Sequence, residues 1–470
     1  MDHDTTSPDP LRFGSGQAVR RLEDQALLAG AGRYTDDVQA AGLTHLIFVR
    51  SPYPHARIVS VDASSALGMP GVVGILSGAD LEAAGVKPMP GTAGFKRPDG
   101  GPGVSPPRRA LAHERVRFVG EPVAAVVAET VEQARNAAEA VFVDYEELPM
   151  VVDLAAAAAP GAPQLLDEAP GNIAAEARHG SADATTTAFA QARYVVALDI
   201  VNQRVVALTI EPRVVLADIE EGTGRLSIRM STQMPSGVRN SVCDAIGLPK
   251  EQVRVVVGDV GGGFGMKTGA YPEDIAVAYC AHVLRRPVKW VADRSEDFLS
   301  SAHGRDIASH AELALDADGK ILALRIHSLA NVGAYATGTG VAIQLLIGPW
   351  VQTSVYDIRT VDFHFQAVLT NCAPTGAYRG AGRPEAIFMM ERLMDEAARQ
   401  TGIDRSELRR RNFIRPEQMP YTNPMKQVYD TGQFEKVMDQ GLALADWSGF
   451  QARAAASNAA GKLRGLGMAT

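Results

Sequence analysis

The stretch GDVGGGFGMK (residues 258–267) places four glycines around one bulky ring, Phe264. The preceding VRVVVGDV (253–260) is typical of a strand, and AYPEDIAVAYCAHVLRR (270–286) is typical of a helix. The glycine stretch is therefore predicted to be a loop that joins a strand to a helix. Three interpretations are open for it: a phosphate cradle, a tight turn, or a backbone that approaches a large rigid ligand closely.

Spacing argues against the phosphate cradle. Gly261 and Gly263 form a GxG pair, but Met266 occupies the place of the third glycine of a dinucleotide fingerprint. Lys267 also lacks the spacing of a phosphate-loop lysine. A Rossmann-type NAD enzyme is thus a distant alternative. A single turn seldom needs four glycines, so close backbone approach to a ligand is the favoured interpretation.

Two further blocks have a related character. In GAYRGAGRPEA (376–386), glycines surround Arg379 and Arg383 just before a predicted helix, where backbone N–H groups favour an anion or an electronegative oxygen. An arginine paired with a nearby carboxylate is the alternative. In STQMPSG (231–237), Gln233 follows a predicted strand, where side chains commonly line a cleft. The alternative is a glutamine that only faces solvent.

Composition limits the function classes. The chain has 470 residues, which suggests about three domains. Its net charge of −8 argues against a general affinity for nucleic acid. The one basic run, residues 409–411, is expected on a solvated helix face. The N-terminus shows no signal peptide and no window is apolar enough to span a membrane, so a cytoplasmic chain is expected.

The cysteines are few and far apart. Cys243, Cys280 and Cys372 form no CxxC pair. An iron–sulfur or zinc cluster cannot be built from this spacing within the chain. The three thiols are expected to be buried or inert.

The first 150 residues mix strands and helices. Strands are predicted at 44–51, 56–62 and 122–128, and Thr130 with Gln133 predicts a capping box for the helix that follows. The Gly/Pro-rich stretch 88–107 is expected to be a loop. An alanine- and proline-rich segment after residue 150 is interpreted as a linker and a domain boundary.

Later segments predict hairpins and helices. Strands flank Glu221–Gly224 and Asp318-Gly319, the latter a strong hairpin signal. A helix is predicted from Pro384 to Gly402, and Asp404 with Glu407 can cap the next one. The last residues, 461–470, are expected to begin a strand, so the chain is interpreted as stopping where a further domain should begin.

Taken together, the three blocks resemble the molybdenum-binding large subunit of the xanthine oxidase family, which includes aldehyde oxidoreductases and aerobic carbon monoxide dehydrogenases. GRYTDD (32–37), VRSPYPHARI (49–58), FVGEPVAAVVAET (118–130) and DYEELP (144–149) are similar to its N-terminal α/β hammerhead domain. IEPR (210–213), the three blocks and RRRNFI (409–414) are similar to its first molybdopterin-binding domain.

The resemblance implies an α+β fold and four segments. These are a hammerhead domain at 20–150, a linker at 151–185, a mixed α+β first molybdopterin-binding domain at 186–415, and a connection at 416–470 to an absent second molybdopterin-binding domain.

The resemblance also assigns site residues. Gln233 should hydrogen-bond an oxo group on molybdenum, and the backbones of Phe264, Gly265 and Arg379 should donate to oxygen ligands and water near the metal. Gln233, Phe264 and Arg379 would thus surround molybdenum without ligating it. The residues expected to bind the cofactor are Gln233, Gly262, Gly263, Phe264, Gly265, Arg379, Gly380 and Ala381. Thr268 and Ala381 are expected to line the substrate pocket.

The implied reaction is hydroxylation of an aldehyde or N-heterocycle with water as the oxygen source. The implied cofactor is a molybdopterin-type molybdenum cofactor, with molybdopterin cytosine dinucleotide as the expected form. The implied partners are a small iron–sulfur subunit that carries 2Fe-2S clusters, a medium FAD subunit and, if the large subunit is split, a chain with the second molybdopterin domain.

Departures from the family pattern restrict the substrate. Copper-bearing carbon monoxide dehydrogenases have a cysteine where this chain has Gly380, so carbon monoxide oxidation by that mechanism is not expected. The xanthine-oxidising branch tends to have an acidic residue at the place of Thr268 and a phenylalanine at the place of Ala381, so a purine is not favoured.

The general-base glutamate of the family is expected in the absent C-terminal half. Glu211, Glu273 and Glu385 lie in or near matching motifs, but none corresponds to that base. The chain is therefore expected to be inactive without its other half. The alternative from a different class is a truncated, non-catalytic remnant or an assembly module that binds partner subunits without cofactor.

Overall fold

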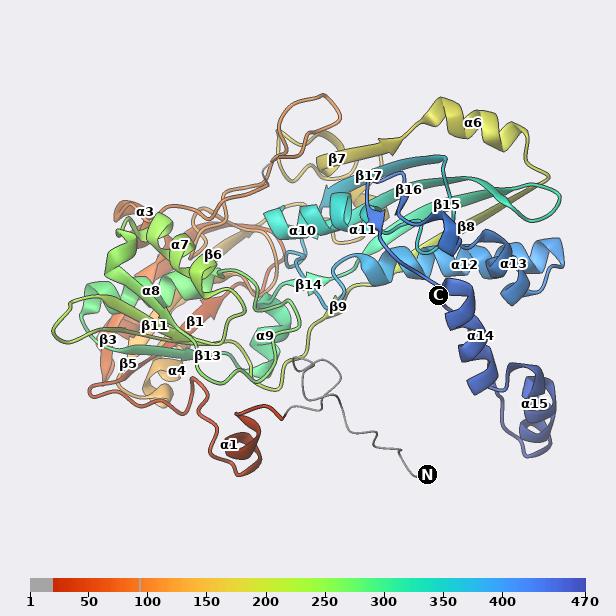
Figure 1. Ribbon diagram of the computed structural model, residues 1–470. Helices are drawn as coiled ribbons and strands as arrows, with labels where there is room; N and C mark the ends of the chain where they lie inside the picture. The colour runs from red at the N-terminus through yellow and green to blue at the C-terminus, as the bar shows by residue number, and fades with distance from the viewer. Residues whose placement is uncertain (1–19, 93) are drawn as a thin grey trace.

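Two large sheets lie at opposite ends of an elongated molecule (Figure 1). The computed structural model describes residues 20–92 and 94–470, so the predicted absence of a signal peptide concerns residues outside the described part. Within the described residues, no helix has the length and apolar character needed to cross a membrane. The two sheets with their helices confirm the predicted α+β class.

Seven strands form the first sheet, in the order β12-β11-β10-β13-β1-β5-β3. Their bounds are β12 Val253–Val256, β11 Leu226–Met230, β10 Val214–Ile219, β13 Val288–Val291, β1 Thr44–Arg50, β5 Pro122–Ala128 and β3 Val72–Ser77. β1 pairs in parallel with β13, with Thr44 opposite Val288. Phe48 packs edge-on against Trp290, with ring centroids 5.4 Å apart. The segments predicted as separate hammerhead and molybdopterin domains therefore share one sheet and one core.

Three helices cover this sheet. They are α4 (Val131–Glu139), α7 (Pro235–Ile246) and α8 (Pro272–Leu284). Thr130 and Gln133 form the predicted capping box of α4. α8 is lined by buried small and branched residues and packs against β10 and β13. The glycine stretch joins β12 to α8, as the sequence predicts.

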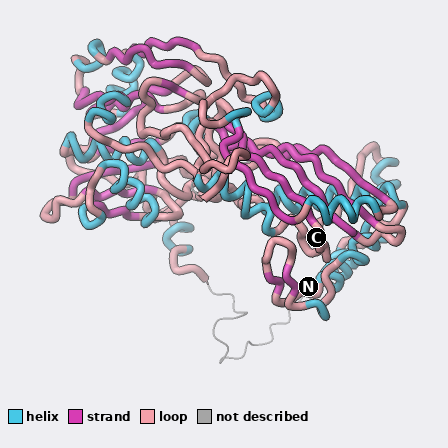
Figure 2. The backbone as a smooth tube through the Cα atoms, turned by 90° about the horizontal axis from the view of Figure 1, so that it is seen from above, coloured by secondary structure: helices cyan, strands magenta, loops and turns pink. Residues whose placement is uncertain are grey.

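The second sheet has the order β7-β17-β16-β15-β8, and its long strands run side by side (Figure 2). Their bounds are β7 Ile173–Gly180, β17 Val361–Leu369, β16 Ile321–Gly333, β15 Ile307–Leu315 and β8 Tyr194–Asn202. β15 and β16 form the predicted hairpin around Asp318-Gly319. α12 (Arg383–Thr401) packs on one face of the sheet and α6 (Ala182–Ala190) on the other.

Two predictions about local structure are wrong. The segment 151–185 is not only a linker, because it contains α5 (Leu154–Ala158) and strand β7, whose backbone hydrogen-bonds to β17. Residues 461–470 contain no strand. Strand β7 forms by pairing with β17, a segment far away in the sequence, which composition does not reveal.

The basic run at 409–411 lies on α13 (Arg405–Asn412), and the expectation of a solvated face is wrong for its first member. The side chain of Arg409 is fully buried, 2.7 Å from a Glu391 carboxylate oxygen and 2.9 Å from Asp395. Arg410 and Arg411 are partly exposed and pair with other acidic side chains. Burial of Arg409 is tolerated because two carboxylates of α12 compensate its charge.

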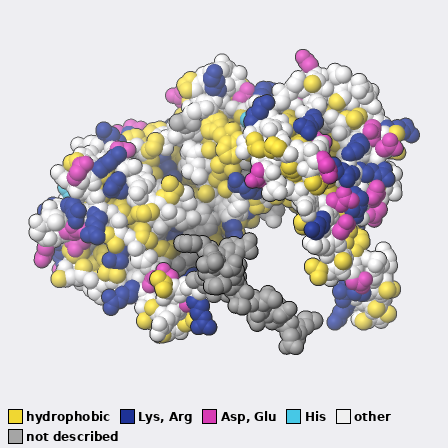
Figure 3. Space-filling view, in the orientation of Figure 1, with side chains coloured by type: hydrophobic (Ala, Val, Ile, Leu, Met, Phe, Trp, Pro, Cys, Tyr) yellow, Lys and Arg dark blue, Asp and Glu magenta, His cyan; other side chains and the backbone are white. Residues whose placement is uncertain are grey.

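The remaining elements are short. The other strands are β2 Ala56–Asp62, β4 Arg115–Val116, β6 Phe142–Glu147, β9 Val205–Val206, β14 His303–Gly304, β18 Tyr421–Thr422 and β19 Val428–Tyr429. The other helices are α1 Asp24–Leu28, α2 Ser64–Leu67, α3 Gly78–Ala83, α9 Arg294–Ser300, α10 Gly338–Ala342, α11 Gly348–Trp350, α14 Phe434–Leu444 and α15 Phe450–Ala459. The surface between the two lobes carries mostly uncharged side chains in the view of Figure 3.

Candidate functional site

The glycine loop and the strand end at Gln233 are joined directly. The backbone N–H of Gly265 donates a hydrogen bond of 2.8 Å to Gln233 Oε1. The backbone N–H of Gln233 donates to the carbonyl oxygen of Lys267 at 2.9 Å. A Cβ at position 263 would lie only 2.7 Å from Gln233 Oε1, so glycine is required there for this contact. The blocks at 231–237 and 258–267 therefore form one structural unit.

The block at 376–386 contacts the same glycine loop. The backbone N–H of Arg379 donates to the carbonyl oxygen of Phe264 at 2.9 Å. The Arg379 guanidinium carbon lies 5.9 Å from the centroid of the Phe264 ring. Gly265 has φ 93°, and a Cβ on it would meet the carbonyl oxygen of Ala377 at 2.7 Å. Gly263 and Gly265 therefore allow close approach to the protein's own loops, and close backbone approach to a ligand stays a prediction.

Several predicted cofactor-binding groups share one exposed surface. Four of these residues are solvent-exposed: Gln233, Phe264, Arg379 and Gly380. Phe264 is 41% exposed. Gln233 Oε1 is occupied by Gly265, so its amide nitrogen is the free end of the side chain. Within residues 20–92 and 94–470 this nitrogen has no hydrogen-bond partner. The surface thus presents the Gln233 amide nitrogen, a neutral donor that is held in place by the glycine loop.

The two predicted substrate-pocket residues lie in different surroundings. Thr268 lines a cavity of about 270 Å³ together with Gly265, Gly376 and Ala377. Ala381 does not line this cavity; it is half-buried, with φ 47°, in the turn before α12. The structure therefore brings Thr268 next to both glycine loops and leaves Ala381 on the helix side of the second loop.

The base of the glycine loop is held by an ion pair that the sequence patterns do not reveal. Lys267 is 2% exposed, and its Nζ lies 3.0 Å from Glu211 Oε2. The same carboxylate oxygen accepts from the backbone N–H of Gly261 at 2.9 Å. Burial lowers the pKa of Lys267, and the charge of Glu211 opposes that shift.

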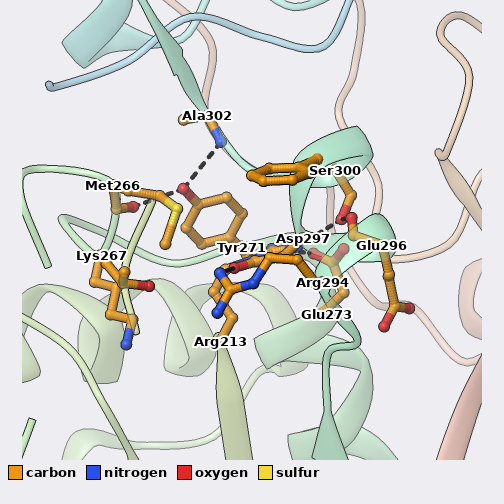
Figure 4. Close-up of polar contacts among 12 residues, drawn as sticks. Arg213, Met266, Lys267, Tyr271, Glu273, Arg294, Glu296, Asp297, Ser300 and Ala302 are labelled. Carbon is orange, nitrogen blue, oxygen red and sulfur yellow. Dashed lines mark hydrogen bonds and ion pairs between the residues drawn. The ribbon is translucent and has the colours of Figure 1, made fainter. Parts of the chain in front are cut away.

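A buried charge network lies directly behind the loop (Figure 4). Arg213 lies 2.8 Å from Asp297 and 3.2 Å from Glu273, and Arg50 lies 3.0 Å from Glu273. Burial alone would raise the pKa of Glu273, but Arg213 and Arg50 outweigh it and lower the pKa to about 2. Glu273 is therefore an ionised structural partner of two arginines.

Tyr271 connects this network to the loop. Its hydroxyl donates to the carbonyl oxygen of Met266 at 2.6 Å and accepts from the backbone N–H of Ala302 at 3.1 Å. The Arg213 guanidinium carbon lies 4.4 Å from the Tyr271 ring centroid. The loop is thus braced from behind by aromatic and charged groups, which favours a single conformation of its exposed face.

Glu385, the third glutamate near a matching motif, is also engaged. It is buried at the start of α12, with Oε1 3.3 Å from Arg305 Nη1. Burial raises the pKa of Glu385, and Arg305 opposes the shift. In the part of the chain that the structure describes, no group of three or more His, Cys, Asp or Glu side chains could hold a metal ion.

The donor set fits a metal carried by an organic cofactor. The free donor is the side-chain amide nitrogen of Gln233, which suits an oxygen atom bound to a metal better than the metal itself. The backbone N–H groups of Gly265 and Arg379, which were expected to donate to such oxygens, instead donate to Gln233 Oε1 and to the Phe264 carbonyl oxygen. The glycine at 263 leaves room for the Gln233 amide, and a side chain there would fill it.

Two family models match the chain. Residues 29–149 match the aldehyde oxidase and xanthine dehydrogenase a/b hammerhead domain, and residues 165–413 match the molybdopterin cofactor-binding domain. The chain therefore consists of an a/b hammerhead domain followed by a molybdopterin cofactor-binding domain. The chain belongs to the family of molybdenum-dependent oxidoreductases that includes xanthine dehydrogenase, aldehyde oxidoreductase and carbon monoxide dehydrogenase.

Individual relatives agree with this assignment. The chain is 35% identical to the nicotine 6-hydroxylase large subunit of Paenarthrobacter nicotinovorans, covering 98% of this chain and 56% of the relative. It is 35% identical to the carbon monoxide dehydrogenase large chain of Hydrogenophaga pseudoflava, covering 95% and 56%. Quinoline 2-oxidoreductase from Pseudomonas putida 86 superposes with a TM-score of 0.88 at 36% identity, covering 95% and 56%. The chain thus spans about 56% of the length of these relatives.

Proposed function

We propose that this chain supplies one wall of a molybdopterin-type site in a molybdenum hydroxylase large subunit. The observation that carries the proposal is the exposed Gln233 amide, fixed by Gly265 beside the backbones of Phe264 and Arg379. A bound cofactor of this type would supply the redox chemistry of hydroxylation with water as the oxygen source. The form that we propose is molybdopterin cytosine dinucleotide.

The residues of this chain would orient the cofactor rather than ligate its metal. Gln233 would donate from its free amide nitrogen to an electron-rich oxygen, because its Oε1 is already occupied. Gly262, Gly263 and Gly380 would keep the two loops closely packed beside the bound group, because a Cβ at each position would meet atoms of the protein itself. Fixed neutral donors of this kind stabilise developing negative charge without reorganisation at the moment of reaction.

The substrate that we propose is an aldehyde or an N-heterocycle. Position 380 is a glycine and offers no thiolate for copper, which argues against carbon monoxide oxidation by a copper-dependent mechanism. Thr268 in the cavity is neutral and Ala381 is small, which argues against a purine. Two relatives are named for nicotine and quinoline, which are both N-heterocycles.

The proposed partners follow from the cysteines. Cys243 and Cys280 are buried, Cys372 is partly buried, and they are distant in sequence. Such thiols cannot bind an iron–sulfur relay within this chain. We therefore propose a small subunit with 2Fe-2S clusters, a medium FAD subunit and, if the large subunit is split, a chain with the second molybdopterin domain, in a cytoplasmic complex.

Isotope labelling tests the proposed function. The chain is purified from its native host with all chains that accompany it, and then incubated with quinoline or benzaldehyde and an electron acceptor in H₂¹⁸O. We expect a product that gains one ¹⁸O atom. An assembled, metal-containing complex that oxidises neither substrate class would contradict the proposal, and a metal-free chain bound to partner subunits would favour the non-catalytic assembly module.

A further inference from the structure

A cavity of about 270 Å³ lies against the contact between the two glycine loops. Gly265 and Ala377, which touch each other there, both form part of its wall. Its other walls carry hydroxyl groups, glycines and small apolar side chains. Arg108 is the one charged side chain among its described lining residues. Among the described lining residues, the cavity therefore has a single positive charge and no negative charge.

The Arg108 side chain has no ion-paired or hydrogen-bonded partner in the part of the chain that the structure describes, although the charges of Glu273 and Glu121 act on it. Within residues 20–92 and 94–470, its guanidinium makes no ion pair and no hydrogen bond, and its Nε is buried without a partner. The guanidinium carbon lies 6.0 Å from the Tyr271 ring centroid and 5.9 Å from that of Tyr335. The adjacent Arg109 differs, since it lies 2.6 Å from Glu82. Arg108 is only partly exposed, so an anion supplied by a ligand would stabilise its charge.

The nearest buried carboxylates do not serve as that anion. Glu273 is held by Arg50 and Arg213 at 3.0 and 3.2 Å. Glu121 accepts from the Tyr335 hydroxyl and from the backbone N–H of Arg117. Both carboxylates are thus committed to other donors. The unpaired charge of Arg108 is left to act on the contents of the cavity.

A second buried polar atom in the same wall lacks a partner. Thr375 is 1% exposed, and its Oγ1 has no hydrogen-bond partner among the described residues. Arg108 and Thr375 lie on separate segments of the chain, yet both line this cavity. Arg108 and Thr375 each hold a buried polar atom without a partner in the wall of this one cavity, which indicates a ligand with a complementary oxygen group. One guanidinium and one hydroxyl suit a singly charged carboxylate better than a doubly charged phosphate.

We infer that Arg108 is a specificity-determining residue that binds the carboxylate of a small aromatic or heteroaromatic substrate in this cavity, an inference that rests on the proposed hydroxylase function. The volume suits a molecule of one or two rings. Rotation of the Thr375 side chain would bring its buried hydroxyl to the same oxygen group. Thr268 also lines the cavity, next to Gly265 and Met266 of the glycine loop.

Direct binding to the full chain tests the inference without any turnover. Calorimetry with pyridine-3-carboxylate and with the neutral pyridine-3-carboxamide measures whether charge is recognised. We expect the carboxylate to bind at least about tenfold more tightly, and Arg108→Met to remove that preference, since a hydrogen bond to a charged group is worth about 1.5–3 kcal/mol. Arg109→Met, next in the chain but paired with Glu82, is the matched control and should retain it.

A second variant covers the case in which Arg108→Met does not fold. Thr375→Val keeps the shape of the side chain and removes its hydroxyl, and it should weaken carboxylate binding about fivefold. Equal affinity of the wild-type chain for the acid and the amide would overturn the inference. Tighter binding of inorganic phosphate than of the carboxylate would also overturn it and would assign the cavity to a phosphate of the cofactor.

The inference and the proposed function can fail separately. In the loaded complex, oxidation of quinoline without any preference for quinoline carboxylates would overturn the inference and leave the hydroxylase function intact. A chain that never acquires molybdenum but binds pyridine-3-carboxylate through Arg108 would overturn the function and support the anion site. In a working complex, we expect Arg108→Met to raise the KM for the carboxylated substrate and leave that for quinoline unchanged.

Discussion

Gly265 and Gln233, 32 residues apart in the chain, are joined by a hydrogen bond of 2.8 Å from the Gly265 backbone N–H to Gln233 Oε1. Because this bond occupies the acceptor end of the amide, it directs the donor end toward the exposed surface. The neighbouring Phe264 carbonyl accepts from Arg379. Two hydrogen bonds, each donated by a backbone N–H group, thus hold the segments around Gln233, Gly265 and Arg379 together at one exposed surface.

Glycine at position 265 should be essential to this arrangement. In Gly265→Ala the Cβ would clash with the Ala377 carbonyl oxygen at 2.7 Å, in addition to the strain of a positive φ. Gly269→Ala is the matched control, because Gly269 also has positive φ, 96°, but nothing lies within 4 Å of a Cβ there. We expect the control to lose about 1–2 kcal/mol of unfolding free energy and Gly265→Ala about 1–3 kcal/mol more, measured by urea denaturation. Equal losses would show that the two loops do not touch in solution.

The buried Arg409 should contribute far more to stability than its neighbour. Arg409→Met leaves Glu391 and Asp395 without their cation and should cost about 3–5 kcal/mol. Arg410→Met removes surface ion pairs from the same helix and should cost at most about 1 kcal/mol. Thermal unfolding of both variants checks the difference. Two similar, small losses would place Arg409 at the surface instead.

Asp274 should make stability depend on pH. It is 2% exposed, and burial, reinforced by the charge of Glu273, raises its pKa to about 7 from an ordinary value of 3.8. The folded state therefore keeps a proton that the unfolded state loses between these values. The stability from Asp274 is complete below the ordinary pKa and is lost as the pH rises through about 7.

Asp274→Asn cannot ionise but still offers an acceptor to the backbone N–H of Tyr271. Relative to wild type, the variant should gain at least about 1 kcal/mol of unfolding free energy between pH 5 and pH 7 and then remain level. Urea denaturation at pH 5, 6, 7 and 8 measures this difference. Asp244→Asn, an exposed carboxylate on α7, should track the wild type. A pH-independent difference would contradict the raised pKa.

Local sequence signals predicted much of the fold. The Thr130–Gln133 capping box and the Asp318-Gly319 hairpin depend on neighbours in the chain, and the structure confirms both. The pairing of β1 with β13 depends on residues far apart in sequence, and no local pattern contains it. The burial of Arg409 was missed for the same reason, since its carboxylate partners lie on another helix.

Some residues of the candidate site could be predicted from the sequence, and others could be found only in the structure. The resemblance to the family singled out Gln233 and the glycine loops, and the structure brings them into contact. The ion pair that fixes the loop, Lys267 with Glu211, has no pattern of its own. Arg108 is conspicuous only through its lack of a partner, which is a property of its surroundings and not of the sequence around it.

The free donor of Gln233 provides the most direct test of the cofactor wall. Gln233→Glu keeps an acceptor for Gly265 and replaces the outward-facing donor by a carboxylate oxygen, so folding should change by less than about 1 kcal/mol. The measurement is molybdenum and pterin per chain in the complex purified from the native host, wild type against Gln233→Glu. The account predicts nearly stoichiometric molybdenum in the wild type and a decrease of about tenfold or more in the variant. Equal molybdenum in both, or a folded wild-type complex without molybdenum, would contradict it.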